Sequence, residues 1–209
     1  MAPVKITIYS DYTCPFCFIG TGIIKALKRE FSIEDDWWPY EVHPDAPLKS
    51  VPLTDHFPDL NPLEFFTRLD ARGKALGVRF GTQTLLCNSR AALELGELAR
   101  AEGLHHEYHE AVFHAYFVEC RDIGNIDVLL AAAGEAGLSR EAARRVLADK
   151  TYTRTVIEST ARGKELDVRA APTFFLEGFG SIRGAQPIET FRNALRGLVD
   201  RGKGFRPLS

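Results

Sequence analysis

Two cysteines separated by two residues lie between a strand pattern and a helical pattern, and this arrangement most constrains the fold. Cys14 and Cys17 enclose Pro15 and Phe16. Residues 4–9 alternate β-branched and polar side chains, as a strand does. Pro15 suits the first turn of a helix, because an N–H group at that position has no partner within the helix and proline lacks only this group. Two cysteines at this spacing can close a small disulfide ring, or they can supply half of a metal site.

The first of the two cysteines is expected at the N-terminus of the helix. Unpaired backbone N–H groups and the helix dipole stabilise a thiolate there, and the thiolate is the form that attacks disulfides. A strand, a CxxC pair and a helix in this order are typical of thioredoxin-like redox proteins. Structural zinc usually takes four ligands, and Cys87 and Cys120 form no second close pair. The pattern therefore favours redox chemistry over a metal half-site.

Composition excludes several other classes of protein. The 209 residues are 45% hydrophobic and 26% charged, as in an ordinary globular protein. The net charge of -2 argues against a nucleic-acid or membrane partner, because both call for a basic surface. The first residues have no signal-peptide pattern, so we expect a cytoplasmic location. The chain is expected as a monomer or a homodimer, and the sequence does not choose between them.

The order of predicted elements is strand–helix–strand, a long run of helices, then strand–strand–helix. A second strand is expected at residues 37–42, near an edge of the sheet because of Pro39. A proline-rich irregular connection follows at 43–62. Further helices are predicted with Asn88 and Ser139 as N-caps, and the last two strands and a final helix come after them. These helices span residues 62–77, 88–103, 105–119, 125–137, 139–149 and 151–166; the strands span 173–176 and 181–183, and the final helix about 187–200.

Neither end of the chain carries enough strands for a sheet of its own. Together they supply the four strands and flanking helices of an α/β thioredoxin-like fold with an inserted all-helical subdomain. An insertion inside one crossover connection leaves such a sheet intact. We therefore predict a thioredoxin-like domain from residues 1–61 and 151–209, and a helical insertion at 62–150.

Several segments resemble the DsbA superfamily, and in particular its FrnE-like branch. Residues 10–20, with the sequence SDYTCPFCFIG, resemble the active-site segment of that family. Residues 170–175 and 184–187 resemble its cis-proline loop and the start of its last helix. Residues 113–117 resemble its middle helices. The resemblance runs from about residue 4 to about residue 195, and the segments occur in the family's order.

This resemblance implies a thiol–disulfide oxidoreductase. Cys14 would be the exposed nucleophile and Cys17 the buried resolving thiol, with a cis Pro172 facing the pair. Phe16, Ala171 and Thr173 would contact the substrate. That substrate would be a protein or a small molecule with a disulfide or a thiol. No cofactor or metal is implied, although glutathione could serve as co-substrate; the direction of electron flow stays open.

The chain departs from the family's pattern at two positions. Phe16 stands where the family more often has tryptophan, and Ala171 stands where it more often has valine. The periplasmic DsbA enzymes have histidine between their cysteines, which helps to stabilise the thiolate. Phe16 cannot ionise, so the helix terminus is the main source of thiolate stabilisation. We therefore expect a weaker oxidant than DsbA itself.

A neighbouring branch of the superfamily gives the alternative function. Kappa-class glutathione transferase and 2-hydroxychromene-2-carboxylate isomerase resemble this chain in fold and at Asn88-Ser89. They keep a serine where Cys14 stands. The resemblance also implies that Asn88 lies near the active site, as the matching residue does in those relatives. Retention of both cysteines favours redox chemistry, but a glutathione-dependent transferase or isomerase remains the alternative. A binding module that kept only the fold is the third hypothesis.

Other reactive side chains have simpler interpretations. His105 and His109 are four residues apart, as two metal ligands on one helical face would be, but most such histidines are solvated or capping. Cys87 and Cys120 are expected as buried, inert thiols, with a resolving or regulatory role left open. Asp11 is expected to hydrogen-bond the turn before the helix.

Overall fold

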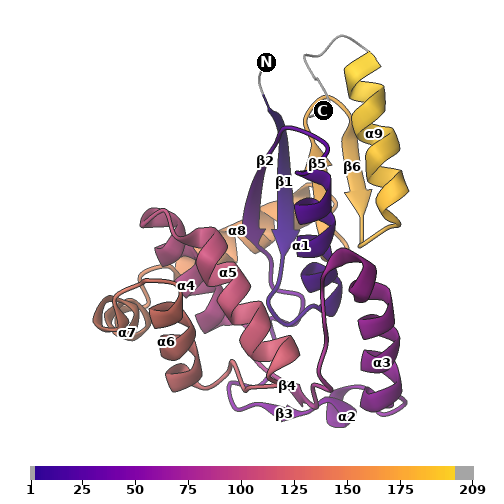
Figure 1. Ribbon diagram of the computed structural model, residues 1–209. Coiled ribbons are helices and arrows are strands. Elements are labelled where there is room, and N and C mark those ends of the chain that lie inside the picture. Colours follow the sequence, from indigo (N-terminus) through magenta and orange to yellow (C-terminus); the bar gives the residue numbers. More distant parts are fainter. Residues whose placement is uncertain (1–2, 201–209) are drawn as a thin grey trace.

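A mixed sheet of four strands forms the centre of the thioredoxin-like part (Figure 1). The computed structural model describes residues 3–200. The strands are β1 (Val4–Ser10), β2 (Ile33–Pro39), β5 (Thr173–Leu176) and β6 (Gly180–Arg183), in the order β2-β1-β5-β6. β1 runs parallel to β2 and antiparallel to β5, and β5 runs antiparallel to β6. This arrangement brings the two ends of the chain into one sheet, as the sequence predicted.

The central strand β1 ends shortly before the cysteine motif and so places the motif at the edge of the core. Ile6 and Ile8 are fully buried and their alternation fixes which face of β1 packs inward. β1 leads directly into α1 (Pro15–Leu27), which packs against α9 (Ile188–Asp200). On the other side of the sheet, α8 (Thr153–Glu165) packs against β2.

Helices α3 to α8 form the insertion between β2 and β5. α8 contacts both α4 and β2, so it joins the insertion to the sheet. The predicted boundary between the helical insertion and the thioredoxin-like domain, at residues 150 and 151, stays a prediction. Residues 1–2 and 201–209 of the predicted thioredoxin-like domain lie outside the described residues. The other elements are β3 (Val51–Pro52), α2 (Leu53–His56), α3 (Pro62–Gly73), the 3₁₀ turn η1 (Lys74–Leu76), β4 (Leu85–Leu86), α4 (Arg90–Ala101), α5 (His105–Phe113), the π-helical turn η2 (His114–Val118), α6 (Ile126–Glu135) and α7 (Arg140–Asp149).

The second strand begins earlier than the sequence predicted. β2 spans Ile33–Pro39 rather than residues 37–42, and it lies at an edge of the sheet as Pro39 indicated. Its first half contains Asp35 and Asp36, which give no strand pattern. Their carboxylates accept hydrogen bonds from the indoles of Trp37 and Trp38, each at 2.6 Å. Side-chain partners thus stabilise an acidic segment in the extended conformation.

The predicted helical run and irregular connection also contain short elements that the sequence missed. β3 and β4 pair antiparallel, and each has two residues, too few for a periodic pattern. The N-cap of α4 is Ser89 rather than Asn88. The Asn88 side chain instead accepts the N–H of Arg90 at 3.0 Å in a turn that delays the helix. The predicted N-cap Ser139 is confirmed, since its hydroxyl accepts the N–H of Ala142 at 3.2 Å.

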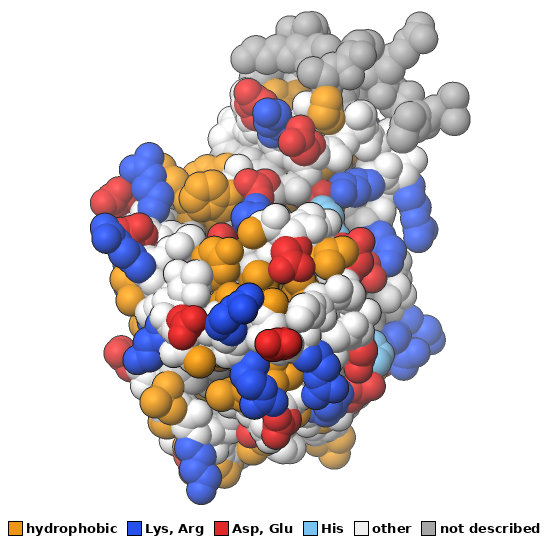
Figure 2. Space-filling model, turned by 90° about the vertical axis from the view of Figure 1, so that its left-hand side faces the viewer, with side chains coloured by type: hydrophobic (Ala, Val, Ile, Leu, Met, Phe, Trp, Pro, Cys, Tyr) orange, Lys and Arg blue, Asp and Glu red, His pale blue; other side chains and the backbone are white. Residues whose placement is uncertain are grey.

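Acidic and basic side chains are interspersed on the face that the insertion presents in Figure 2. Apolar side chains lie between them. No helix within residues 3–200 is long and apolar enough to cross a membrane.

A buried histidine joins the insertion to the cysteine motif. His109 on α5 is 5% exposed, and its Nδ1 lies 3.4 Å from the hydroxyl of Tyr12. Its ring also packs against Trp37 and Phe113. Burial, together with the nearby His105, His106 and Arg100, holds the pKa of His109 well below its usual range. His109 is therefore neutral in the folded protein near pH 7.

This neutral histidine should make the protein less stable in mild acid. Below pH 6.5 the unfolded chain binds a proton at His109 that the folded protein does not bind. Its contribution to stability is complete above pH 6.5 and is lost as the pH falls, by about 1.4 kcal/mol per pH unit. His109→Leu should flatten the decline of the free energy of unfolding between pH 7 and pH 5, measured by urea titration. His114→Leu, which changes an exposed histidine at the end of the same helix, should leave that decline as steep as in the wild type.

Candidate active site

A turn held by Asp11 connects β1 to the cysteine motif. The Asp11 carboxylate accepts the backbone N–H and the hydroxyl of Thr13, both at 2.9 Å. Its second oxygen accepts the N–H of Val42 at 2.7 Å, in the segment that follows β2. The Asp11 carbonyl accepts the N–H of Cys14 at 3.1 Å. The expected role of Asp11 in the turn is confirmed, and this buried side chain fixes where α1 begins.

Cys14 is the N-cap residue of α1, and Cys17 lies one turn further on. The Cys14 carbonyl accepts the N–H of Cys17 at 3.0 Å, which closes the first turn. Both cysteines are free thiols. Cys14 is 8% exposed and Cys17 is fully buried. The sequence correctly predicted that Cys14 is more exposed than Cys17, but the prediction of an exposed Cys14 was wrong. Cys14 is buried, and its sulfur lies against the Ala171 carbonyl in the loop before β5.

The environment of Cys17 keeps that thiol protonated. Burial raises the pKa of Cys17 well above its usual range, and the neighbouring Cys14 thiol raises it further. The hydroxyl of Ser10 and the backbone of Asp11 act in the opposite direction. The Ser10 hydroxyl is buried and makes no well-formed hydrogen bond within the described residues. Ser10 is therefore a neighbour of the reacting thiols that the sequence analysis missed, although it lies only four residues before Cys14.

The loop before β5 lies against the reactive cysteine. The Ala171–Pro172 peptide bond is cis. The Cys14 thiol donates a hydrogen bond to the Ala171 carbonyl at 3.2 Å, across 157 residues of sequence. The Thr173 hydroxyl donates to the Ala170 carbonyl at 2.7 Å, which holds the loop. The structure thus brings Cys14, Cys17, Ala171 and the adjoining Pro172 and Thr173 together.

A glycine allows α1 to approach this loop closely. A Cβ atom at Gly20 would lie 3.2 Å from the Phe174 ring and 3.5 Å from Pro172. A side chain at this position would require the Phe174 ring or α1 to shift by a few tenths of an ångström.

Phe16 lies at the surface beside the thiols, and an arginine from the insertion covers part of it. The ring is 36% exposed, and the guanidinium of Arg72 lies 5.8 Å from the ring centroid. Arg72 is on α3 and also donates a hydrogen bond to the Ala185 carbonyl. It therefore links the cysteine motif to the segment after β6. No local pattern could have indicated Arg72, because only the packing of α3 places it there.

The structure shows no bond between Asn88 and the cysteines. Its amide donates to the Ala46 carbonyl at 2.7 Å, and its oxygen accepts the N–H of Arg90. Both bonds organise the loops around the start of α4. A role for Asn88 in substrate binding stays a prediction.

The other two cysteines lie apart from the motif. The Cys87 thiol donates to the Asp122 carboxylate at 3.1 Å, and burial raises the pKa of Cys87 to about 11. Cys87 is buried as expected, whereas Cys120 is partly exposed. Within residues 3–200, no three side chains of His, Cys, Asp or Glu are arranged to hold a metal ion.

Comparison with known proteins identifies the family. The DSBA-like thioredoxin domain family matches residues 5–196. The uncharacterised protein YwbO of Bacillus subtilis (strain 168) is 30% identical over 195 residues, which are 92% of this chain and 96% of YwbO. A probable DsbA oxidoreductase from Streptomyces coelicolor has a TM-score of 0.86 at 26% identity, with 99% of this chain and 93% of that chain covered. The chain therefore belongs to the DSBA-like thioredoxin domain family.

The fold class predicted from the sequence is thereby confirmed. A 2-hydroxychromene-2-carboxylate isomerase also shares the fold, with a TM-score of 0.76 at 19% identity and coverage of 95% of this chain and 98% of that chain. The resemblance to the DsbA superfamily is confirmed at the level of the family. The placement in the FrnE-like branch stays a prediction.

Proposed function

We propose that this protein is a thiol–disulfide oxidoreductase of the FrnE-like branch, acting on protein or low-molecular-weight disulfides and thiols. One observation carries the proposal. The Cys14 thiol lies at the N-terminus of α1 and donates to the Ala171 carbonyl, with the free Cys17 thiol buried one turn behind it. A cytoplasmic location belongs to this proposal, because in a reducing compartment a CxxC pair is more often catalytic than structural.

The first step of reduction uses the more exposed thiol. The Cys14 thiolate attacks one sulfur of a substrate disulfide, whose S–S bond breaks as the Cys14–substrate bond forms. The other substrate sulfur leaves as a thiolate and takes a proton from water. The dipole of α1 stabilises the attacking anion.

The second step uses the buried thiol. Cys17 loses its proton and attacks the Cys14 sulfur, which releases the second substrate thiol and leaves a Cys14–Cys17 disulfide. The raised pKa of Cys17 keeps it protonated until the mixed disulfide has formed. Two electrons pass to the substrate, and a low-molecular-weight thiol such as glutathione returns them to the protein. The same steps in reverse oxidise a dithiol substrate.

The loop before β5 supplies the surface on which a substrate chain would lie. In the resting dithiol the Ala171 carbonyl accepts the Cys14 S–H. Formation of the thiolate removes this donor and frees the carbonyl to accept a backbone N–H of the substrate. Phe16 offers an exposed aromatic surface beside the sulfur.

Cys17→Ser distinguishes disulfide exchange from kappa-type chemistry. With glutathione disulfide, this variant should stop at a mixed disulfide on Cys14, because the resolving thiol is absent. Intact-protein mass spectrometry should show one glutathione bound to each chain, and catalytic turnover should be lost. The matched control is Cys87→Ser, which changes another buried thiol with a raised pKa and should leave turnover unchanged.

Two outcomes would contradict the proposal. Full exchange activity in Cys17→Ser would show that Cys17 does not resolve the mixed disulfide. Conjugation of glutathione to 1-chloro-2,4-dinitrobenzene at the same rate in the wild type and in Cys17→Ser, without disulfide exchange in either, would favour the transferase alternative.

A further inference from the structure

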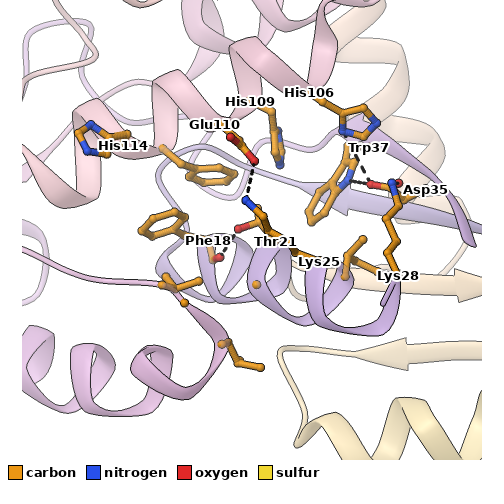
Figure 3. A pocket seen from close by; sticks show the side chains of 16 residues that line it. Phe18, Thr21, Lys25, Lys28, Asp35, Trp37, His106, His109, Glu110 and His114 are labelled. Atoms are coloured by element: carbon orange, nitrogen blue, oxygen red, sulfur yellow. Dashed lines mark hydrogen bonds and ion pairs between the residues drawn. The ribbon is translucent and has the colours of Figure 1, made fainter. Parts of the chain in front are cut away.

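Ser10 is a buried serine at the end of β1, and its side chain faces the helix that carries the two cysteines. It is 5% exposed. Side chains alternate along a strand, so Ser10 points to the same face of the sheet as Ile6 and Ile8. Trp37, which pairs with Ile8, lies against α1 on this face (Figure 3), and a Cβ atom at Gly20 would be 3.7 Å from its ring. The Ser10 hydroxyl is therefore enclosed between β1 and α1.

The oxygen of this hydroxyl makes no well-formed hydrogen bond within the described residues. A buried hydroxyl without a partner is costly, and native proteins rarely keep one. Its reactive neighbour is the Cys17 sulfur. Burial and the Cys14 thiol raise the pKa of Cys17, whereas the Ser10 side chain and the Asp11 backbone act to lower it. The unused donor thus lies where a negative charge on sulfur would need it.

Resolution of a mixed disulfide creates such a charge in a place that water does not reach. Cys17 is fully buried, so its thiolate forms without hydration. Hydrogen bonds to an ionised acceptor are stronger than those to a neutral one, and a low local dielectric strengthens them further. In the resting dithiol the Cys17 sulfur is neutral and gains little from the hydroxyl. The Ser10 donor therefore contributes most in the resolving step.

We propose that the Ser10 hydroxyl donates a hydrogen bond to the Cys17 sulfur as that sulfur ionises, and thereby promotes the attack that resolves the mixed disulfide. This role rests on the proposed disulfide exchange and concerns its second step. The Cys17–Cys14 bond forms as the bond between Cys14 and the substrate sulfur breaks. The proton that Cys17 loses is balanced by the proton that the released substrate thiolate takes up. Ser10 itself neither gains nor loses a proton.

Ser10→Ala should affect the second step of exchange and not the first. Reduced protein is mixed with excess glutathione disulfide and quenched in acid at successive times, and intact-protein mass spectrometry resolves the reduced, glutathionylated and oxidised chains. The mixed disulfide should form at the wild-type rate. Its conversion to the Cys14–Cys17 disulfide should slow about threefold at pH 7. A loss of about tenfold in thiolate is partly offset, because a thiolate of higher pKa is the better nucleophile.

The stability of the variants distinguishes this role from a structural one. Removal of a hydroxyl without a partner leaves no other group unpaired, so Ser10→Ala should melt at or above the wild-type temperature. Ser159→Ala is the matched control, because the Ser159 hydroxyl is similarly buried and donates to the Pro39 carbonyl at 2.7 Å. It should lower the melting temperature and leave both rates unchanged. Ser10→Thr keeps the hydroxyl and should restore fast resolution.

Three results would overturn the role of Ser10: resolution at the wild-type rate in Ser10→Ala, equal slowing of both steps in that variant, or resolution slowed as much in Ser10→Thr as in Ser10→Ala. If Ser10→Thr fails to fold, the two rates in Ser10→Ala still decide the question. A wild type that forms neither a mixed disulfide nor a Cys14–Cys17 disulfide would instead contradict the proposed function itself, so the two failures are distinguishable.

Discussion

Replacing Cys14 by Ser is expected to reduce disulfide exchange to the rate of the buffer blank. Cys14 is the sulfur at the N-terminus of α1, and a serine hydroxyl does not ionise there at neutral pH. Cys17 cannot take over, because it is fully buried and its pKa is raised well above the usual range. The measurement is the steady-state reduction of insulin disulfides by excess glutathione, with the wild type and the variant at equal concentration.

The fold should survive this change. Serine is close to cysteine in size and can keep the hydrogen bond to the Ala171 carbonyl. The free energy of unfolding should therefore change by less than about 1 kcal/mol. Cys120→Ser is the control, because it removes a free and partly exposed thiol outside the motif. If Cys14→Ser stayed active and Cys120→Ser lost activity, the nucleophile would be Cys120 and the proposed mechanism would be wrong.

The elements that could be predicted from the sequence are those whose formation depends on their own residues. β1 alternates along its length, Pro15 and the apolar spacing after it define α1, and the bounds of β5 agree with the predicted strand. Each of these signals lies within the element itself. Where distant residues decide the structure, local patterns fail. The acidic first half of β2 is strand because it pairs with β1 and finds side-chain partners.

The same distinction explains which parts of the site could be predicted. Cys14 and Cys17 belong to one short motif, and the loop at Ala171 was found through its resemblance to a family. Arg72 reaches Phe16 only because α3 packs beside α1, and no spacing in the sequence encodes that approach. The contact between the Cys14 sulfur and the Ala171 carbonyl likewise depends on a loop more than 150 residues away.

Replacing Arg90 by Met is expected to cost about 3–5 kcal/mol of the free energy of unfolding. Arg90 is the first residue of α4, and its guanidinium makes two parallel bonds to the Glu41 carboxylate, at 2.5 and 2.6 Å. The Glu41 side chain is 3% exposed. Methionine fills a similar volume but leaves a buried carboxylate without its counter-charge. Urea unfolding near pH 7 measures the loss.

Loss of the Arg90–Glu41 pair should weaken one connection in the molecule and not the fold as a whole. Glu41 follows β2 and Arg90 begins α4, so the bond ties the sheet to the insertion. Hydrogen exchange in Arg90→Met should therefore increase most at the start of α4 and in the segment after β2.

Two further variants distinguish the effect of an unpaired buried charge on stability from the effect of lost packing. Arg68→Met removes an exposed ion pair with Glu64 on α3 and should cost less than about 0.5 kcal/mol. Adding Glu41→Gln to Arg90→Met removes the unpaired charge and should restore a large part of the lost stability, because a neutral amide is less costly to bury than a carboxylate. A double variant no more stable than Arg90→Met would mean that packing of the arginine stem, and not its charge, joins the insertion to the sheet.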